Sequence, residues 1–235
     1  MRWNPWHGCK KFSEGCLNCY VYRIDERHGK DSSIILRNKD FNLPLRRTRK
    51  GGFKIPSGET VYTCFSSDFF LEEADAWRKE AWQIIKYRFD LNFFIITKRI
   101  LRVRENLPPD WGEGYPNVSI ACTVENQKRA DERLPEYLAL PLQHRFIICE
   151  PLLQNIDLSA YLSPKINGLI AGGESGDKGR NSNYEWFLSL RQQCIKAGVP
   201  FTFKQTGTHF IKDGKLYTIP RHLQHTQARK ADINT

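Results

Sequence analysis

The feature that most constrains the fold is a repeated alternation of short β-rich runs with longer helix-like segments. Residues 61–66, 93–97, 118–123, 145–149, 168–172 and 201–204 form short apolar runs of strand length. Residues 72–87, 126–138 and 185–197 carry apolar side chains at helical spacing, and Gly198 and Pro200 stop the last of them. Because crossover helices join parallel strands, this order predicts an α/β fold with a parallel sheet.

Six such runs, with a short extra strand at residues 2–6, favour a partial (β/α) barrel of six to seven parallel strands. An open doubly wound sheet is the alternative, but no glycine-rich dinucleotide motif follows the first strand. The length of 235 residues fits one large domain. We therefore expect a single barrel domain over residues 1–211, followed by a basic C-terminal tail over residues 212–235.

Polar side chains follow the predicted strands. In a (β/α) barrel the carboxyl ends of the strands converge on one face, which holds the active site. Helix capping is the alternative, and it accounts for Asp68 and Thr123. It does not account for Lys98, Arg99 or Lys204, since positive charge is unfavourable at a helix N-terminus. The strand-end residues are Ser66, Ser67, Asp68, Lys98, Arg99, Thr123, Glu125, Asn126, Glu150, Glu174, Lys204 and Gln205.

The charge is unbalanced, with 36 Lys and Arg against 26 Asp and Glu and a net charge of +10. A basic excess attracts polyanions such as nucleic acids, although simple solubility is an alternative reason for it. Residues 37–54 form a loop-like stretch in which four cations, Arg46, Arg47, Arg49 and Lys50, precede a Gly-Gly pair. This stretch is either a nucleic-acid contact or a solvated segment.

No apolar run is long enough to span a bilayer, and no secretory leader is evident at the N-terminus. We therefore expect a cytoplasmic protein without a membrane partner, in a compartment where thiols stay reduced. The seven cysteines are an odd number and do not form a disulfide set. Three of them lie within eleven residues, and the other four are scattered.

The N-terminal cysteines, Cys9, Cys16 and Cys19, have the spacing C-x6-C-x2-C, and Gly8 and Gly15 precede the first two. Thiolates select zinc or iron–sulfur clusters over hard cations. A structural zinc site needs four ligands, whereas three cysteines on a [4Fe-4S] cluster leave one iron open. That iron is able to chelate S-adenosylmethionine, whose sulfonium bond is cleaved when an external donor reduces the cluster.

Two other interpretations of these cysteines remain open. Zinc would take His7 as its fourth ligand, and the protein would then be a zinc-stapled, non-catalytic nucleic-acid-binding protein. A redox pair of Cys16 and Cys19 would leave Cys9 unexplained.

A set of short motifs carries a resemblance that covers nearly the whole chain. They are Asn4-Pro5-Trp6, Gly8-Cys9, Gly15-Cys16-x-x-Cys19-Tyr20, Asp68-Phe69-Phe70, Thr97-Lys98-Arg99, Pro116-Asn117-Val118, Val124-Glu125-Asn126, Glu150-Pro151-Leu152-Leu153, Gly172-Gly173-Glu174-Ser175-Gly176 and Phe203-Lys204-Gln205-x-Gly207. In this order they resemble the phage-type three-cysteine-motif proteins, a radical S-adenosylmethionine-like family with distant similarity to spore photoproduct lyase. The first cysteine gap is six residues here, where the wider superfamily usually has three.

The resemblance implies a partial (β/α) barrel of the radical S-adenosylmethionine type, with the cluster on Cys9, Cys16 and Cys19. It also implies that the end of the second strand meets the amino group of the cofactor, the end of the fourth meets the ribose, and the residue after the last cysteine packs near the adenine. In this chain those residues are Ser66, Ser67 and Asp68, then Thr123, Glu125 and Asn126, and finally Tyr20.

The remaining polar residues are predicted to face the substrate. They are Lys98, Arg99, Glu150, Glu174, Arg180, Lys204 and Gln205. Two lysines and two arginines favour an anionic substrate, either a nucleotide or a nucleic acid. The alternative for Glu150 and Glu174 is that they form salt bridges with these cations.

Overall fold

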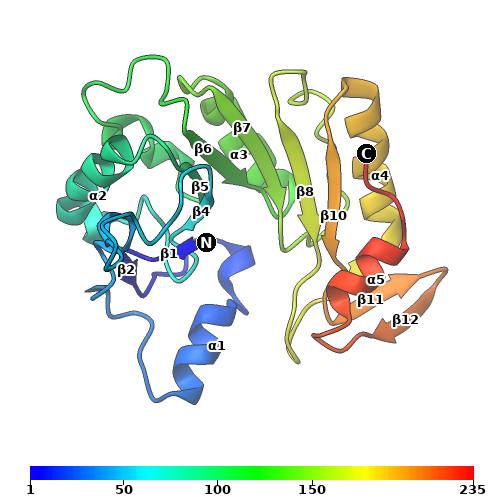
Figure 1. The fold of residues 1–235 in the computed structure, drawn as a ribbon. Helices are drawn as coiled ribbons and strands as arrows, with labels where there is room; N and C mark the ends of the chain where they lie inside the picture. Colours follow the sequence, from blue (N-terminus) through cyan, green and yellow to red (C-terminus); the bar gives the residue numbers. More distant parts are fainter. The chain divides into compact units, whose positions relative to one another are not determined.

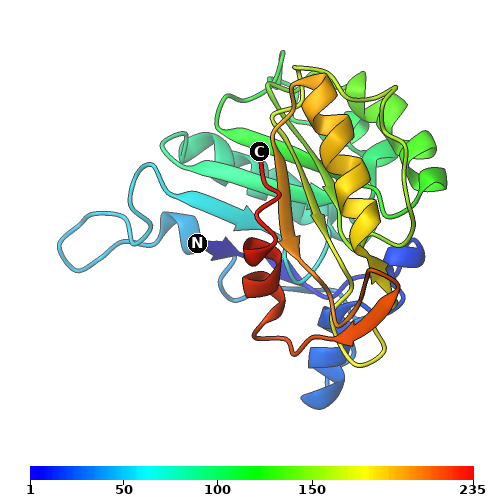
Figure 2. The ribbon, with the colours of Figure 1, turned by 90° about the vertical axis from the view of Figure 1, so that its right-hand side faces the viewer.

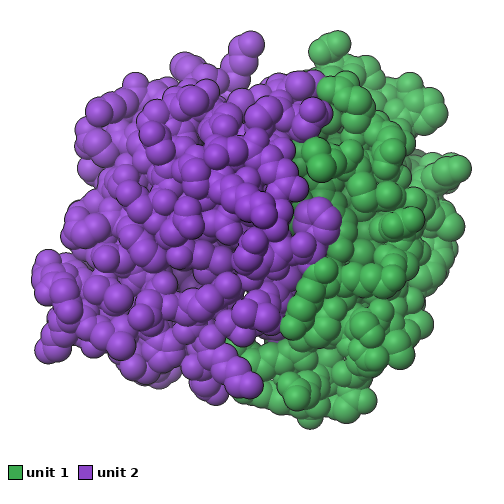
Figure 3. All heavy atoms as spheres, turned by 180° about the vertical axis from the view of Figure 1, so that it is seen from behind, with its two compact units in different colours: residues 1–11, 21–121, 140–144 green, residues 12–20, 122–139, 145–235 purple.

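A computed structural model describes residues 1–235 and divides the chain into two compact units, coloured separately in Figure 3. The first unit is Met1–Lys11, Val21–Ala121 and Leu140–His144, and the second is Phe12–Tyr20, Cys122–Ala139 and Arg145–Thr235. The sequence suggested one domain over residues 1–211. The structure instead changes unit within the cysteine segment and again within the strand at residues 118–123.

The main sheet has seven strands in the order β1-β4-β5-β6-β7-β8-β10, labelled in Figure 1. The strands are β1 (Arg2–Trp3), β4 (Thr60–Thr63), β5 (Asn92–Thr97), β6 (Val118–Thr123), β7 (His144–Cys149), β8 (Gly168–Gly172) and β10 (Phe201–Gln205). The order follows the chain without the reversal of a doubly wound sheet, which is the winding of a (β/α) barrel. The predicted α/β fold with a parallel sheet of six to seven strands is confirmed, and the sheet has seven.

The first unit packs aromatic side chains on its part of the sheet. β1 pairs in parallel with β4, with Trp3 opposite Thr63, and β4 pairs in parallel with β5. Trp3 is fully buried, and its ring meets the edges of Phe41 and Phe93. Full burial of one such side chain contributes roughly 2–3 kcal/mol. The unit also contains α2 (Asp75–Tyr87) and most of α1 (Tyr20–Arg27), and a short antiparallel pair of β2 (Trp6–His7) with β3 (Leu36–Arg37).

The second unit carries β7, β8 and β10, which pair in parallel, with α3 (Gln127–Leu138) and α4 (Tyr184–Ala197). α4 lies alongside β10 in Figures 1 and 2, and the Phe187 ring lies 4.3 Å from the Phe203 ring, centroid to centroid. The helix ends at Gly198, whose φ of 66° is left-handed and unstrained only in glycine. A small sheet joins β9 (Ser182–Asn183), β11 (His209–Lys212) and β12 (Lys215–Thr218).

Residues 212–235, suggested by sequence as a basic tail, are structured and belong to the second unit. They contain β12 and α5 (Gln224–Lys230). The last residues run along β10, where Thr235 N donates to Phe201 O at 3.0 Å and Phe203 N donates to Asn234 Oδ1 at 2.7 Å. β10 is the edge of the main sheet, so its outer backbone groups need partners, and this segment supplies them.

Candidate functional site

In the first unit, the segment around Cys9 is fixed by hydrogen bonds to its backbone. Cys9 N donates to Ser32 O at 2.8 Å, and Tyr22 OH donates to Cys9 O. Gly8 N donates to Ser66 O at 3.2 Å, while Ser67 Oγ donates to Gly8 O. Gly8 has a φ of 89°, and a Cβ there would lie 2.3 Å from a backbone oxygen, so only glycine fits. The predicted residues Ser66 and Ser67 thus bind the backbone of Gly8, the residue before the first cysteine.

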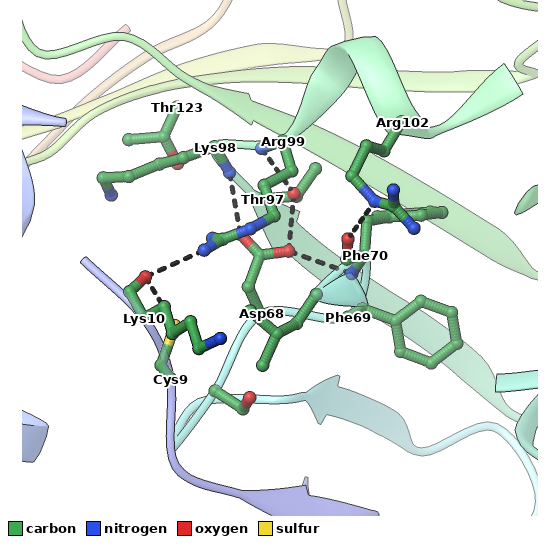
Figure 4. A network of polar contacts seen from close by, with 12 residues as sticks. Cys9, Lys10, Asp68, Phe69, Phe70, Thr97, Lys98, Arg99, Arg102 and Thr123 are labelled. Carbon is green, nitrogen blue, oxygen red and sulfur yellow. Dashed lines mark hydrogen bonds and ion pairs between the residues drawn. The ribbon is translucent and has the colours of Figure 1, made fainter. Parts of the chain in front are cut away.

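Asp68 is the centre of the polar network in Figure 4. Its Oδ1 accepts from Thr97 Oγ1 at 2.7 Å and from Phe70 N at 2.9 Å. Its Oδ2 accepts from Lys98 N at 3.1 Å and lies 3.4 Å from Arg99 Nη1. Four donors use the lone-pair directions of a carboxylate, and the Arg99 contact is the longest of them.

Arg99 connects Asp68 to the cysteine segment. Its Nη2 donates to the carbonyl oxygen of Lys10, the residue after Cys9, at 2.8 Å. The ammonium of Lys98 points away from Asp68 in Figure 4, so Lys98 contributes only its backbone N–H to this network. The motif Thr97-Lys98-Arg99 thus binds the Asp68 carboxylate through a hydroxyl, a backbone amide and a guanidinium, one from each residue.

The turn after β4 is strained. Cys64 has a φ of 61°, a left-handed conformation that costs a non-glycine residue about 1–2 kcal/mol. Its carbonyl accepts from Ser67 N at 3.2 Å, which closes the turn that contains Ser66. Ser66 Oγ is buried and has no hydrogen-bond partner. A buried hydroxyl without a partner is rare, because its desolvation is not compensated.

In the second unit, Glu125 binds the segment that carries Cys16. Glu125 is fully buried, and its Oε1 accepts from Gly15 N at 3.3 Å and from Ser13 Oγ. A Cβ at Gly15 would lie 2.9 Å from that same oxygen, so the close approach requires glycine. The other carboxylate oxygen accepts from Arg133 Nη1 at 2.7 Å. The predicted ribose-binding residue thus has protein partners on both oxygens.

Glu174 anchors the same segment from the end of β8. Its Oε2 accepts from Asn18 Nδ2 at 3.0 Å, and its two oxygens accept from Arg180 at 2.6–2.9 Å. Burial raises the pKa of Glu174, but the hydrogen bonds from Arg180 and Asn18 outweigh it, and the net pKa is below the usual value. Arg180 Nη2 also donates to Glu14 O at 3.0 Å. The predicted substrate-facing pair of Glu174 and Arg180 holds the residues on either side of Cys16.

Arg133 is a buried cation that sequence reasoning missed. It uses Nη1 for Glu125 and for Thr123 O, at 2.7 and 2.6 Å. Its Nε and Nη2 have no hydrogen-bond partner, although the side chain is only 1% exposed; the guanidinium lies over the Phe12 ring, 5.6 Å from its centroid. Thr123 Oγ1, at the end of β6, is also buried without a partner. Two groups around Glu125 therefore have unused hydrogen-bonding capacity.

A second cluster in this unit joins residues from the ends of β7 and β10. Glu150 accepts from Lys204 Nζ at 2.6 Å and from Gln205 Nε2 at 2.7 Å. Arg221, from the C-terminal segment, donates to Gln205 Oε1 at 2.8 Å. The alternative that Glu150 and Glu174 form salt bridges with the neighbouring cations is thus confirmed. Arg221 was not predicted, because nothing in its local sequence indicates which strand its segment covers.

The two remaining predicted residues have other surroundings. Asn126 caps α3 by accepting from Arg129 N at 2.9 Å, so its side chain performs the capping that the sequence analysis assigned to Thr123. Tyr20 begins α1 and is 44% exposed. The cofactor-binding roles of these residues stay predictions.

The cysteines fall into two classes. Cys9, Cys16 and Cys19 are half-buried and free of disulfides, while Cys64, Cys122, Cys149 and Cys194 are fully buried. Burial raises the pKa of the Cys64 and Cys149 thiols well above their usual range and that of Cys194 to about 12, so these three are protonated in the core. Cys9 belongs to the first unit and the other two N-terminal cysteines to the second. No group of three or more His, Cys, Asp or Glu side chains is placed to hold a metal ion.

The first unit also has a cleft that contains none of the predicted site residues. It has a volume of about 860 Å³ and lies beside α2, with Trp82 and Tyr115 among its lining residues. Its charged groups are largely paired with one another, as in the ion pair of Lys86 with Asp110. The cleft therefore offers aromatic surface with little excess charge.

The comparisons with other proteins place the chain in a family without assigning an activity. Neither a curated protein nor a solved structure matches it. No helix has the length and apolar character needed to cross a membrane. One family profile covers almost the whole sequence, over residues 1–233, and its description is "Protein of unknown function (DUF5131)". On that match, the chain belongs to the DUF5131 family.

Proposed function

We propose that the protein is a radical S-adenosylmethionine-type iron–sulfur enzyme that acts on a nucleic acid or nucleotide. The observation that carries the proposal is the way in which strand-end residues hold the segments of Cys9 and Cys16. In the first unit, Ser66, Ser67 and Arg99 bind the backbone beside Cys9. In the second, Glu125 binds the backbone beside Cys16.

The number and type of the donors suit a cluster with three protein ligands, although the three side chains are not gathered into a metal site in this structure. Three cysteines lie within eleven residues, and they alone among the seven are half-exposed. When bound, a [4Fe-4S] cluster with one open iron supplies the electron that cleaves the sulfonium bond of S-adenosylmethionine. Cys9, Cys16 and Cys19 would hold it, and an external donor would reduce it.

The chain's own residues would position and enclose the cofactor. Ser66 Oγ, in the first unit, and Thr123 Oγ1, in the second, are buried hydroxyls without hydrogen-bond partners, and each of them supports an additional polar group beside it. Arg133 would present its Nε and Nη2 edge in the same part of the second unit as Thr123. Asp68, Glu125 and Glu174 would act as positioning residues, since their oxygens bind the chain itself.

The test is anaerobic purification followed by measurement of iron, sulfide, zinc and the visible spectrum. The proposal predicts about four irons and four sulfides per chain with a broad band near 400 nm, lost together in Cys16→Ala. It further predicts that 5′-deoxyadenosine forms when the protein is reduced by an external electron donor in the presence of S-adenosylmethionine. Cys194→Ala is the matched control, because that thiol is buried and protonated, and it should keep the cluster. A colourless protein with one zinc after anaerobic reconstitution would exclude the radical chemistry.

One contact favours the second candidate, a zinc-stapled nucleic-acid-binding protein without catalysis. His7 Nε2 lies 2.8 Å from Asp25 Oδ2, and Asp25 also accepts from Ser32 Oγ. A carboxylate that orients a histidine ring is the usual outer partner of a zinc-binding histidine, which leaves Nδ1 for the metal. His7→Ala separates the two candidates, because it removes the fourth zinc ligand but none of the three cysteines.

A further inference from the structure

The basic turn, defined as residues 46–54, has a fixed backbone. Arg47 and Phe53 form an antiparallel bridge. Inside it, Thr48 N donates to Gly52 O at 2.7 Å, and Gly51 takes a φ of 87° that glycine adopts without strain. Figure 2 shows this light-blue segment projecting from the rest of its unit. The turn is therefore a projecting element with a defined backbone path.

A buried arginine holds the base of the basic turn from both sides. Arg88 is fully buried, and its guanidinium donates to Pro44 O on one side and to Ile55 O, at 2.8 Å, on the other. Asp90 neutralises it, with 2.7 Å between Arg88 Nε and Asp90 Oδ1. The guanidinium also stacks on Phe53, 3.9 Å from the ring centroid. These contacts fix the direction in which the turn projects.

The cations at the tip of the turn lack acidic partners. Arg46 pairs with Asp40 at 2.6 Å, and Arg47 donates to a backbone carbonyl within the turn. The other cations are exposed, and none has a carboxylate oxygen within 4.0 Å: Arg49, Lys50 and Lys54. Arg37, in the same unit, is by contrast paired with Glu80. A solvated face would mix both signs of charge, whereas this turn presents four positive charges without a carboxylate partner, those of the three cations just named and of Arg47.

Two exposed aromatic side chains lie at the end of α2, beside the turn. Tyr87 is 59% exposed, and its ring meets the Phe53 ring edge-on, with 6.3 Å between centroids. Phe89, two residues further on, is 79% exposed. Aromatic faces stack on the bases of a single strand, whereas a duplex encloses its bases. The combination of preorganised cations and exposed rings is that of a single-strand binding surface.

We infer that the basic turn binds single-stranded nucleic acid, with Arg49, Lys50 and Lys54 on the phosphates and Tyr87 and Phe89 stacked on bases. This deepens the proposed function and rests on it only for the role of the bound strand as substrate. Each phosphate contact on a single strand contributes about 0.7 to the slope of log affinity against log salt. Three contacts therefore contribute a slope of about 2, or roughly 100-fold in affinity at 0.1 M salt.

The experiment is fluorescence anisotropy of the full chain with a labelled 20-nucleotide single strand, its 20-base-pair duplex, and phosphatidylglycerol-containing vesicles, over 50–300 mM salt. R49A/K50A/K54A should weaken single-strand binding about 100-fold and lower the salt slope by about 2. The matched control K128A/K165A/K196A removes the same charge from three exposed lysines of the second unit and should change binding less than about threefold. Y87S/F89S removes two stacking contacts of about 1 kcal/mol or more each, so it should weaken binding at least about 30-fold without altering the salt slope.

Several outcomes would overturn the inference. Equal losses in the two triple variants would show that net charge alone attracts the strand. Tighter binding of the duplex, or of the vesicles, would assign the turn to another partner. R49K/K50R/K54R keeps the charge and should bind like the wild type, so a loss there would also contradict the phosphate contacts.

Binding by the turn is separable from the cluster. Cys16→Ala should abolish the iron content and leave single-strand affinity unchanged, whereas R49A/K50A/K54A should keep the iron. A protein that binds no iron would therefore contradict the proposed function alone, and a protein that binds no single strand would contradict the inference about the basic turn alone.

Discussion

The carboxylate of Glu125 accepts a hydrogen bond from the backbone N–H of Gly15 at 3.3 Å, across 110 positions of sequence. Glu125 lies just beyond the end of β6, and Gly15 precedes Cys16. The conformation of the residue before the second cysteine thus depends on a buried group of the sheet. The spacing of the cysteines does not by itself determine this conformation.

Gly15→Ala should disturb this contact. The added Cβ would lie 2.9 Å from Glu125 Oε1, so either the segment or the carboxylate has to move. We expect a stability loss of about 1–2 kcal/mol in urea unfolding, together with a clear fall in reconstituted iron. Gly52→Ala is the control, since its Cβ would meet nothing closer than 4.0 Å. Wild-type iron content in Gly15→Ala would show that the contact does not position Cys16.

The buried ion pair of Glu125 and Arg133 should respond non-additively. Glu125→Gln or Arg133→Met leaves one charge buried without its partner and should cost about 3–5 kcal/mol. The double variant removes both charges and should cost clearly less than the sum of the two. Urea unfolding of the four proteins measures the coupling. Additive losses would show that the two side chains act independently.

The hydroxyl of Thr123 should matter for ligand binding and not for folding. Thr123→Val removes a buried group without a partner, so stability should stay constant or rise by up to about 1 kcal/mol. Thr97→Val is the contrast, because Thr97 Oγ1 donates to Asp68 at 2.7 Å, and it should lose about 1–2 kcal/mol. The thermal shift induced by S-adenosylmethionine should shrink in Thr123→Val. An undiminished shift would exclude a contact of this hydroxyl with the cofactor.

The two classes of cysteine should differ in reactivity. In metal-free native protein, iodoacetamide should modify Cys9, Cys16 and Cys19, which are half-exposed. The four buried thiols should react only after unfolding, because burial keeps them inaccessible and raises the pKa of Cys64, Cys149 and Cys194. Mass spectrometry of the labelled peptides counts the sites. Native labelling of Cys149 would contradict the packing of β7.

Asp90 should make the base of the basic turn sensitive to acid. The hydrogen bond from Arg88 is the main cause that lowers the pKa of Asp90 below its usual value. The stabilisation is therefore complete above pH about 4, the range of an unfolded aspartate, and is lost as the pH falls through the lower folded pKa. Asp90→Asn should be less stable than the wild type at pH 7, and the difference should close in acid. A constant difference in urea midpoint between pH 7 and pH 3 would contradict this linkage.

The strands and helices were predictable because the spacing of apolar residues and the length of each run distinguish a strand from a helix. The run at residues 145–149 is β7 but for one residue, and the helix at residues 185–197 is α4, which ends at Gly198 as expected. The helix expected over residues 72–87 begins with a 3₁₀ turn, Glu72–Ala74, before α2. The small sheet of β9, β11 and β12 was not predicted, since strands of two to four residues show no reliable alternation.

The site residues were predictable as strand ends, but their partners were not. Glu125 and Glu174 were located correctly as polar residues after β6 and β8. Their hydrogen bonds to the cysteine segment span more than 100 positions, which local patterns do not reveal. Arg133 did leave a signal, because it falls on the buried face of α3 beside Leu134 and Ala130. A cation within an apolar stripe indicates a buried acidic partner.

The long-range anchoring of the cysteine segment determines when it acquires its conformation during synthesis. Asn18 is fixed by Glu174, 156 positions later, and Glu14 by Arg180, 166 positions later. A ribosome has therefore to translate most of the chain before residues 13–18 can adopt their final geometry. If the proposed cluster is delivered by an assembly machinery, that machinery must either wait for this stage or hold the nascent cysteines in a different, provisional arrangement.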